Sequence, residues 1–282
     1  MPNVQGYEAK HFVVTSPTEN VLRVEINRPE KLNAFFEPMW LELGSLMNKV
    51  SHDPDYRAVV ITAAGERAFT AGLDVEAASQ GGALGVSKDV DPARKATQVR
   101  RHIDEFQACI SAVEKCEKPV IVAMHGISIG LAIDLSSCAD VRFCSKDTRF
   151  SVKEVDIGIA ADIGTLTRLP KIVGSFSWVK EVALSARWFD AEEALRVGFV
   201  SQVFDNKAKT VEAAIEYATL LASKSPIAVQ GTKELLNHAR DNTVADSLRY
   251  TAIWNMSMIQ CKDTQDALMA GLKKKKPTFS KL

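Results

Sequence analysis

Two glycine-containing turns are the first candidates for chemistry in this sequence. AFTAGLDV (68–75) follows a short apolar run, and HGISIGLAIDL (125–135) leads from another into a short helix. Such turns direct backbone N–H groups away from a sheet edge, and a helix N-terminus favours negative charge. Two N–H donors converging on one oxygen would stabilise the enolate formed by proton loss beside a thioester carbonyl. Ordinary strand-to-helix turns share this pattern, so both interpretations stay open.

Motifs for several other chemistries do not occur in the sequence. It has no GxGxxG after a strand, no GxxxxGK[ST] and no HExxH. The histidines lack metal-ligand spacing, so we expect no metal ion; they are His11, His52, His102, His125 and His238. The sequence therefore disfavours dinucleotide binding, nucleotide hydrolysis and zinc chemistry.

Composition excludes further classes of protein. Of the 282 residues, 46% are apolar and 25% are charged, which is typical of globular proteins. Basic and acidic residues number 35 each, so no net field attracts nucleic acid or an anionic membrane. No apolar run is long enough to span a membrane, and no secretory signal is evident at the N-terminus. We expect neither nucleic acid nor membrane as a partner.

The cysteines are odd in number, scattered and without a CxxC pair. This pattern favours buried thiols in a reducing compartment over a disulfide framework. They are Cys109, Cys116, Cys138, Cys144 and Cys261.

The two turns lie among segments with alternating strand and helix patterns. RAVVITA (57–63) and PVIVAM (119–124) are almost wholly apolar, as in strands covered on both faces. Residues 39–50 have helical spacing, and the Gly-, Ser- and Asp-rich segment 79–95 predicts a mobile loop or lid before a helix over about 95–116. Strand–turn–helix units recur to about residue 200, which predicts a βαβ architecture.

The pattern changes to helix in the last third of the chain. Residues 207–273 contain three or four helical segments with almost no strand signal. We therefore predict a core over 1–200 that holds the site, and a helical assembly region over 201–282. The sequence given ends in Ser280-Lys281-Leu282, a tripeptide read as a peroxisomal address, although chance would also produce it.

Four successive blocks resemble the crotonase (enoyl-CoA hydratase/isomerase) superfamily. The similarity runs in order over about residues 10–200. It implies an α/β fold, a crotonase-like spiral of ββα units with a C-terminal helical trimerisation region, and a fatty acyl-CoA substrate without a further cofactor. The blocks are INRPEKLNAF (26–35), AFTAGLDV, HGISIGLAIDLSSCADVRF (from 125) and FSVKEVDIGIAADIGTLTRLP (150–170).

The resemblance also places the two backbone donors. It implies an oxyanion hole formed by the N–H groups of Leu73 and Leu131. Family members usually carry a run of glycines where this chain has Gly130-Leu131-Ala132, so two Cβ atoms enter the turn here. The implied substrate-binding residues are Ala71, Gly72, Leu73, Asp74, Val75 and Ala132.

The acidic residues indicate a branch of the superfamily. Classical hydratases carry glutamates at the positions of Asp134 and Glu154, whereas here the first is aspartate and Asp162 is a third acid. This trio is similar to that of Δ3,5-Δ2,4-dienoyl-CoA isomerases, which implies proton transfer from C2 to C6 in fatty acid β-oxidation. Exchange at both ends of a diene favours two acid–base groups, for which we expect Glu154 and Asp162. Asp134 would hold or polarise them.

Other interpretations compete with this one. Asp162 would also serve as the N-cap of the following helix, before Ile163-Gly164-Thr165. An enoyl-CoA hydratase or a Δ3-Δ2-enoyl-CoA isomerase of the same superfamily is the nearest alternative. An inactive assembly protein is more distant, because a pure scaffold has no reason to bury carboxyl groups at a cost in stability.

The resemblance further implies partners. Coenzyme A would lie against residues 26–35 and the AGLDV turn, with Asp74 structuring that turn. Residues 273–276, all lysine, would pair with its phosphates or form a solvated basic tail that displays the address. We expect a homotrimer or homohexamer, and recognition of Ser280-Lys281-Leu282 by a peroxisomal import receptor.

Overall fold

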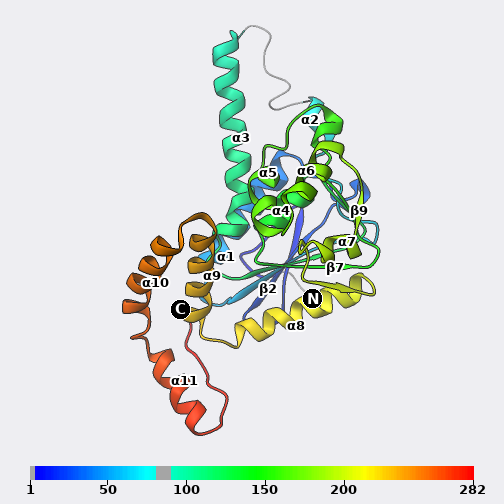
Figure 1. Ribbon diagram of the computed structural model, residues 1–282. Helices are drawn as coiled ribbons and strands as arrows, with labels where there is room; N and C mark the ends of the chain where they lie inside the picture. The colour runs from blue at the N-terminus through cyan, green and yellow to red at the C-terminus, as the bar shows by residue number, and fades with distance from the viewer. Residues whose placement is uncertain (1–3, 81–89) are drawn as a thin grey trace.

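A computed structural model describes residues 4–80 and 90–282 (Figure 1). Its strands alternate between a six-stranded sheet, in the order β1-β2-β3-β5-β7-β10, and a four-stranded sheet, in the order β4-β6-β8-β9. In the pairs β3/β4, β5/β6 and β7/β8, the first strand joins the larger sheet and the second joins the smaller. The chain therefore winds as a spiral of ββα units, which confirms the expected fold class.

The spiral is built from short, mostly parallel strands. Among the strand pairs of the described residues, β1–β2 and β8–β9 are antiparallel and the others are parallel. The strands are β1 (Phe12–Thr18), β2 (Val21–Ile26), β3 (Ala58–Ala63), β4 (Ala68–Thr70), β5 (Val120–Met124), β6 (Ile127–Ile129), β7 (Val141–Ser145), β8 (Arg149–Ser151), β9 (Phe189–Asp190) and β10 (Gln202–Phe204).

Helices cover both faces of the larger sheet, which explains why β3 and β5 are apolar apart from Thr62. Every residue of these two strands is buried. On one face lies the main core, to which α1 and α3 contribute. On the other face α8 packs through Ala214, Ala218 and Ala222, small side chains at i, i+4 spacing that allow a close approach (Figure 1).

The helices lie between and after these strands in the sequence. They are α1 (Glu37–His52), α2 (Val75–Gln80), α3 (Pro92–Lys115), α4 (Leu131–Cys138), α5 (Thr165–Ile172), α6 (Phe176–Ser185), α7 (Ala191–Arg196), α8 (Lys207–Ala222), α9 (Pro226–Asp241), α10 (Val244–Met258) and α11 (Lys262–Leu272), with 3-10 turns η1 (Pro29–Lys31) and η2 (Glu154–Ile157).

One predicted turn contains a strand. Residues 126–130 were expected to form only a turn, but Ile127–Ile129 form β6, which pairs with β4 and β8. Three residues between two glycines carry no strand period of their own, so only neighbouring strands reveal the pairing. The loop or lid predicted over 79–95 lies largely outside the described residues; α3 begins at Pro92, where the carboxylate of Asp91 caps it.

The C-terminal helices divide into two groups. β10 joins the larger sheet and α8 covers it, so both pack with the core although they follow residue 200. Helix α9 packs beside the core, where its Lys233 pairs with Asp140 at 2.8 Å, whereas α10 and α11 extend away from the core (Figure 1). No residue of α10 is buried, and its apolar side chains Val244, Leu248, Ile253 and Met256 are half or more exposed.

The last residues return to the core. Arg57 donates through Nη2 to the carbonyl oxygens of Phe279 and Ser280, at 2.7 and 3.1 Å. Lys281 forms an ion pair with Asp55. The tripeptide that resembles a targeting signal is thus held against its own subunit. Within the described part of the chain, no helix is long and apolar enough to cross a bilayer.

The cysteine thiols are free. Three of them are buried, as expected: Cys116, Cys138 and Cys144. Cys109 and Cys261 are only partly buried.

Candidate active site

The two glycine turns lie in direct contact. Gly72 and Gly130 both have positive φ, at +86° and +55°, which favours glycine. A Cβ on Gly72 would lie 3.0 Å from the carbonyl oxygen of Ile129 and 3.6 Å from the nitrogen of Leu131. Because β4 and β6 are neighbours in the smaller sheet, the turns after them meet at one edge.

Leu73 and Leu131 present their backbone N–H groups at this edge. Around them the backbone is bonded: Gly130 N–H donates to Ser151 O at 3.0 Å, and Asp74 N–H donates to Phe35 O at 2.7 Å. Within the described residues, neither the Leu73 N–H nor the Leu131 N–H donates to a protein acceptor. Leu131 is also the first residue of α4, whose N-terminal dipole favours negative charge there.

The Gly130-Leu131-Ala132 departure leaves the turn intact. Gly130 is the N-cap of α4, and both following side chains belong to the main core, with Leu131 4% and Ala132 0% exposed. The added Cβ atoms are therefore absorbed by core packing.

Asp74 structures the first turn, as expected. It forms an ion pair with Arg28 at 2.8 Å and accepts a hydrogen bond from the Ala77 N–H at 3.1 Å. Burial opposes ionisation, but these two contacts hold the pKa of Asp74 below its ordinary value.

Asp134 is buried within α4. Its residue is 2% exposed, and one oxygen, Oδ1, accepts hydrogen bonds from the backbone N–H of Thr165 at 2.6 Å and from its hydroxyl at 2.7 Å. Burial raises the pKa of Asp134 to about 6, although the Thr165 donors act in the opposite direction.

Glu154 brings a partly buried carboxyl group to the site. It begins η2 and is half-buried, and its Oε1 lies 3.4 Å from the position of a Cβ on Gly130. Its other oxygen, Oε2, is buried and has no hydrogen-bond partner among the described residues. Burial, and secondly the charge of Asp134, raise the pKa of Glu154 to about 7.

Asp162 lies at the solvent-exposed rim. Partial desolvation there still raises its pKa. Gln107 of α3 donates to its backbone carbonyl at 2.5 Å. The alternative that Asp162 caps the next helix is wrong: α5 begins at Thr165 with Gly164 as N-cap and no side-chain cap from Asp162. The carboxylate of Asp134 supplies that cap from a distant part of the sequence.

A cavity of about 230 Å³ joins these groups. Asp74 and Ala132 do not line it. Most of the expected residues do: Ala71, Gly72, Leu73, Val75, Leu131, Asp134, Glu154 and Asp162. The other lining residues were not predicted as site residues, although Ile129 and Gly130 belong to the second glycine turn: Phe106, Ile129, Gly130, Lys153, Ile157, Ile159 and Ile163.

One cluster elsewhere resembles a cation site. Ligand atoms of Glu37, His102 and Glu105 lie within 4.8 Å of one another, brought together from α1 and α3 rather than by sequence spacing. Both glutamates are exposed, and exposed acidic groups often lie this close without a metal.

The cavity can carry out proton transfer. It combines an apolar lining with three carboxyl groups whose pKa values are all raised, two of them to about 6 and about 7. Carboxyl groups of this kind hold or release a proton near neutral pH. Free backbone donors beside them suit an oxygen that becomes negative.

This fold and site define an acyl-CoA enzyme of the crotonase type. The family model described as enoyl-CoA hydratase/isomerase matches residues 17–281, and the chain belongs to that family. The resemblance seen in the sequence blocks is thereby confirmed.

Two relatives and one solved structure show which members of the family this chain is similar to. The mitochondrial Δ3,5-Δ2,4-dienoyl-CoA isomerase of Mus musculus is 46% identical, with 99% of this chain and 85% of that protein covered. The peroxisomal Δ3,5-Δ2,4-dienoyl-CoA isomerase of Arabidopsis thaliana is 38% identical, with 99% of each covered. The crystal structure of an enoyl-CoA hydratase from Bacillus anthracis superimposes with a TM-score of 0.86 at 27% identity, over 96% of this chain and 99% of that one.

Proposed function

We propose that this protein is a Δ3,5-Δ2,4-dienoyl-CoA isomerase of fatty acid β-oxidation. One observation carries the proposal: Asp134, Glu154 and Asp162 line a single apolar cavity beside the Gly72 and Gly130 turns. The relatives named for this reaction, at 38% and 46% identity over nearly the whole chain, support the same activity.

The reaction requires one proton to leave C2 and one to arrive at C6. A base takes the C2 proton, and the C–H electrons form an enolate extended through both double bonds. An acid then delivers a proton to C6, so that the double bonds move to C2 and C4 and no atom is gained or lost. Glu154, with its buried and unpartnered Oε2, suits the C2 step. Asp162, at the rim of the same cavity, suits C6.

The enolate oxygen needs donors in place before the proton leaves. The N–H groups of Leu73 and Leu131 fill this role in the proposal, because the described structure leaves both without a protein acceptor. A preorganised pair of donors stabilises developing charge most where water is excluded.

Coenzyme A would lie outside the cavity, against residues 26–35 and the turn that follows β4. The isolated β-bridge between Phe35 and Leu73 joins these two segments. The thioester activates C2 by itself, so the proposal includes no cofactor beyond the coenzyme A of the substrate.

A spectrophotometric assay with 3,5-octadienoyl-CoA tests the proposal. The expected product is a 2,4-diene conjugated with the thioester, and its absorbance should appear without added cofactor. The matched control is a 2-enoyl-CoA, with hydration followed under the same conditions. Rapid hydration without diene migration would assign the protein to the hydratases instead.

The assembly is also proposed. We infer a homotrimer or homohexamer in which α9 to α11 contact neighbouring subunits. The support is the absence of any buried residue in α10, together with exposed apolar residues of α11 such as Leu268 and Leu272.

We further propose that the protein is peroxisomal and is imported through Ser280-Lys281-Leu282. The Arabidopsis relative is named peroxisomal, whereas the Mus musculus relative is named mitochondrial. Leu282 is 52% exposed, but the contacts of Arg57 and Asp55 hold the residues before it. A receptor must therefore displace these contacts to bind the tripeptide in full.

A further inference from the structure

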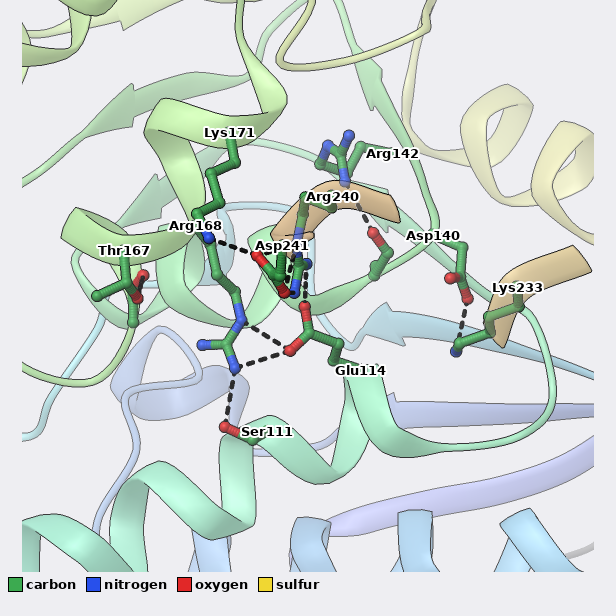
Figure 2. A network of polar contacts seen from close by, with 12 residues as sticks. Ser111, Glu114, Asp140, Arg142, Thr167, Arg168, Lys171, Lys233, Arg240 and Asp241 are labelled. Carbon is green, nitrogen blue, oxygen red and sulfur yellow. Dashed lines mark hydrogen bonds and ion pairs between the residues drawn. The ribbon is translucent and has the colours of Figure 1, made fainter. Parts of the chain in front are cut away.

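Arg168 of α5 is almost fully enclosed by polar partners. Its guanidinium donates through Nε and Nη2 to Oε2 of Glu114, at 3.2 and 3.0 Å, and through Nη2 to the hydroxyl of Ser111 at 2.9 Å (Figure 2). The Arg168 and Glu114 side chains are only 13% and 16% exposed. Two donors on the same carboxylate oxygen restrict the orientation of the planar guanidinium as well as its position.

The remaining nitrogen of this guanidinium packs against the active-site loop. A Cβ on Gly164 would lie 2.2 Å from Nη1 of Arg168 and 4.0 Å from Oδ1 of Asp134. Arg168 therefore occupies the space that a side chain at position 164 would need. It lies against the peptide that connects Asp162 to Thr165, on the side that also faces Asp134.

Glu114 is held from a second direction. Arg240 of α9 pairs with Oε1 of Glu114, and Arg168 takes Oε2, so the carboxylate joins α5 to α9 through α3 (Figure 2). Burial opposes ionisation of Glu114, but the bonds from the two arginines hold its pKa below the ordinary value. The clamp formed by Arg168, Glu114 and Arg240 thus stays charged at neutral pH.

We propose that Arg168 is a positioning residue for the proton-transfer site: by holding Gly164 and Thr165 against α3, it fixes Asp162 relative to Asp134. This inference rests on the proposed isomerase function. Thr165 bonds Asp134 directly, and Gly164 is its neighbour, so a shift of this loop moves two of the three acids at once.

The geometry gives Arg168 two separable effects. The first is mechanical, because loss of the guanidinium uncovers Gly164 and lets the loop relax. The second is electrostatic: burial raises the pKa of Asp134, the Thr165 bonds lower it, and the positive charge of Arg168 adds a smaller lowering effect. Arg168→Lys would retain the positive charge but lose the paired hydrogen bonds to Glu114, whereas Arg168→Met would lose both the charge and the bonds.

Lys171 offers a matched control on the same helix. It pairs with Asp241 of α9 and so also bridges α5 to α9 (Figure 2). However, both of these side chains are well exposed, at 47% and 39%. Lys171 is linked to the clamp indirectly, through Asp241, which also pairs with Arg240 at 2.8 Å. Lys171→Met should therefore leave turnover within about twofold of the parent, as for most exposed ion pairs.

The experiment compares Arg168→Met, Arg168→Lys and Lys171→Met. Turnover per folded subunit on 3,5-octadienoyl-CoA should fall about 10²-fold in Arg168→Met, with KM nearly unchanged, because misplaced acids affect chemistry rather than binding. The carboxyl of Asp134, followed by carbon-13 NMR in aspartate-labelled protein, should titrate at higher pH in Arg168→Met and near the parent pH in Arg168→Lys. If Arg168→Met does not fold, turnover of Arg168→Lys and Glu114→Gln still tests the proposal, because both keep the positive charge and lose only the bonds between Arg168 and Glu114.

Two results would overturn the proposal. One is an equal loss of turnover in Arg168→Met and Lys171→Met, which would make Arg168 an ordinary bridge between helices. The other is an Asp134 titration unchanged by Arg168→Met. If the parent protein itself does not isomerise the dienoyl substrate, the proposed function fails separately, and the Asp134 titration still decides whether Arg168 acts on this site.

Discussion

Thr165 donates two hydrogen bonds to a single oxygen of Asp134, one from its backbone N–H at 2.6 Å and one from its hydroxyl at 2.7 Å. The first bond satisfies a free N–H at the start of α5, so Asp134 acts as the cap of that helix. The second bond stabilises a carboxylate that is otherwise buried in the core. Asp134 therefore connects α4, which begins at the Gly130 turn, to the loop that carries Asp162.

Replacing Thr165 tests this connection. Thr165→Val removes the hydroxyl donor and keeps the shape, and it should lower the free energy of unfolding by about 1.5–3 kcal/mol, the usual value for a bond to a charged group. Urea denaturation measures the change. Thr165→Ser keeps the hydroxyl and should stay close to the parent; equal destabilisation by both substitutions would contradict the role of the hydroxyl bond.

The pH dependence follows from Glu154. Its pKa is about 7, so a base at this position loses its proton, and kcat/KM rises, as the pH increases through about 7. The charge of Asp134 contributes to that raised value. Asp134→Asn removes this repulsion, lowers the pKa of Glu154 and should move the acid limb to lower pH. Rate profiles of both proteins measure the shift, and a limb that moves upward would show that the base is not Glu154.

The fold could be predicted further than the site. The almost wholly apolar residues of β3 and β5 already indicate a sheet covered on both faces, and the ordered blocks identify the family. By contrast, β6 is a strand only because β4 and β8 lie on either side of it. Three residues do not carry a period that distinguishes a strand from a turn.

The acidic residues of the site could be predicted from the sequence, whereas their contacts could not. Asp134, Glu154 and Asp162 were identified by matching blocks, and the cavity contains all three. The hydrogen-bond partners of these acids could not be predicted, because Thr165, which bonds Asp134, lies 31 positions away in the sequence. The alternative that Asp162 caps α5 is wrong for the same reason: the cap of α5 comes from another element, which no local pattern encodes.

Deletion of Leu282 tests whether Ser280-Lys281-Leu282 is a peroxisomal targeting signal. A fluorescent protein fused to the N-terminus should give a punctate, peroxisomal pattern with the parent and a cytosolic one after deletion of Leu282. Activity should survive the deletion, because Leu282 does not line the active-site cavity. A pattern that stays punctate without Leu282 would rule out import through this tripeptide.

Molecular mass in solution tests the assembly. Light scattering at micromolar concentration should give a trimer or a hexamer. Replacing Leu248 and Ile253 of α10 with aspartate should shift the mass downward, because charges in an apolar interface stay unpaired. Thr251→Ala on the same helix is a suitable control. A monomeric parent would contradict the proposed assembly.

The roles of Glu154 and Asp162 are tested by their amides. Glu154→Gln and Asp162→Asn keep the size of each side chain and most of its hydrogen bonding but remove proton transfer. Turnover of the dienoyl substrate should therefore fall by about 10²–10⁴-fold in each. Affinity should change little, because coenzyme A is bound outside the cavity in the proposed complex. Asp134→Asn should fall less, since Asp134 is expected to orient the other groups.

The decisive comparison is Asp162→Asn on two substrates. Proton delivery to C6 is needed only for the diene, so isomerisation should collapse, while any hydration of a simple 2-enoyl-CoA should persist near the parent rate. The opposite pattern, with isomerisation intact, would mean that Asp162 takes no part in proton transfer. Because Asp162 does not cap α5, loss of a helix cap cannot explain the collapse. A thermal unfolding midpoint equal to that of the parent would then assign the loss to chemistry alone.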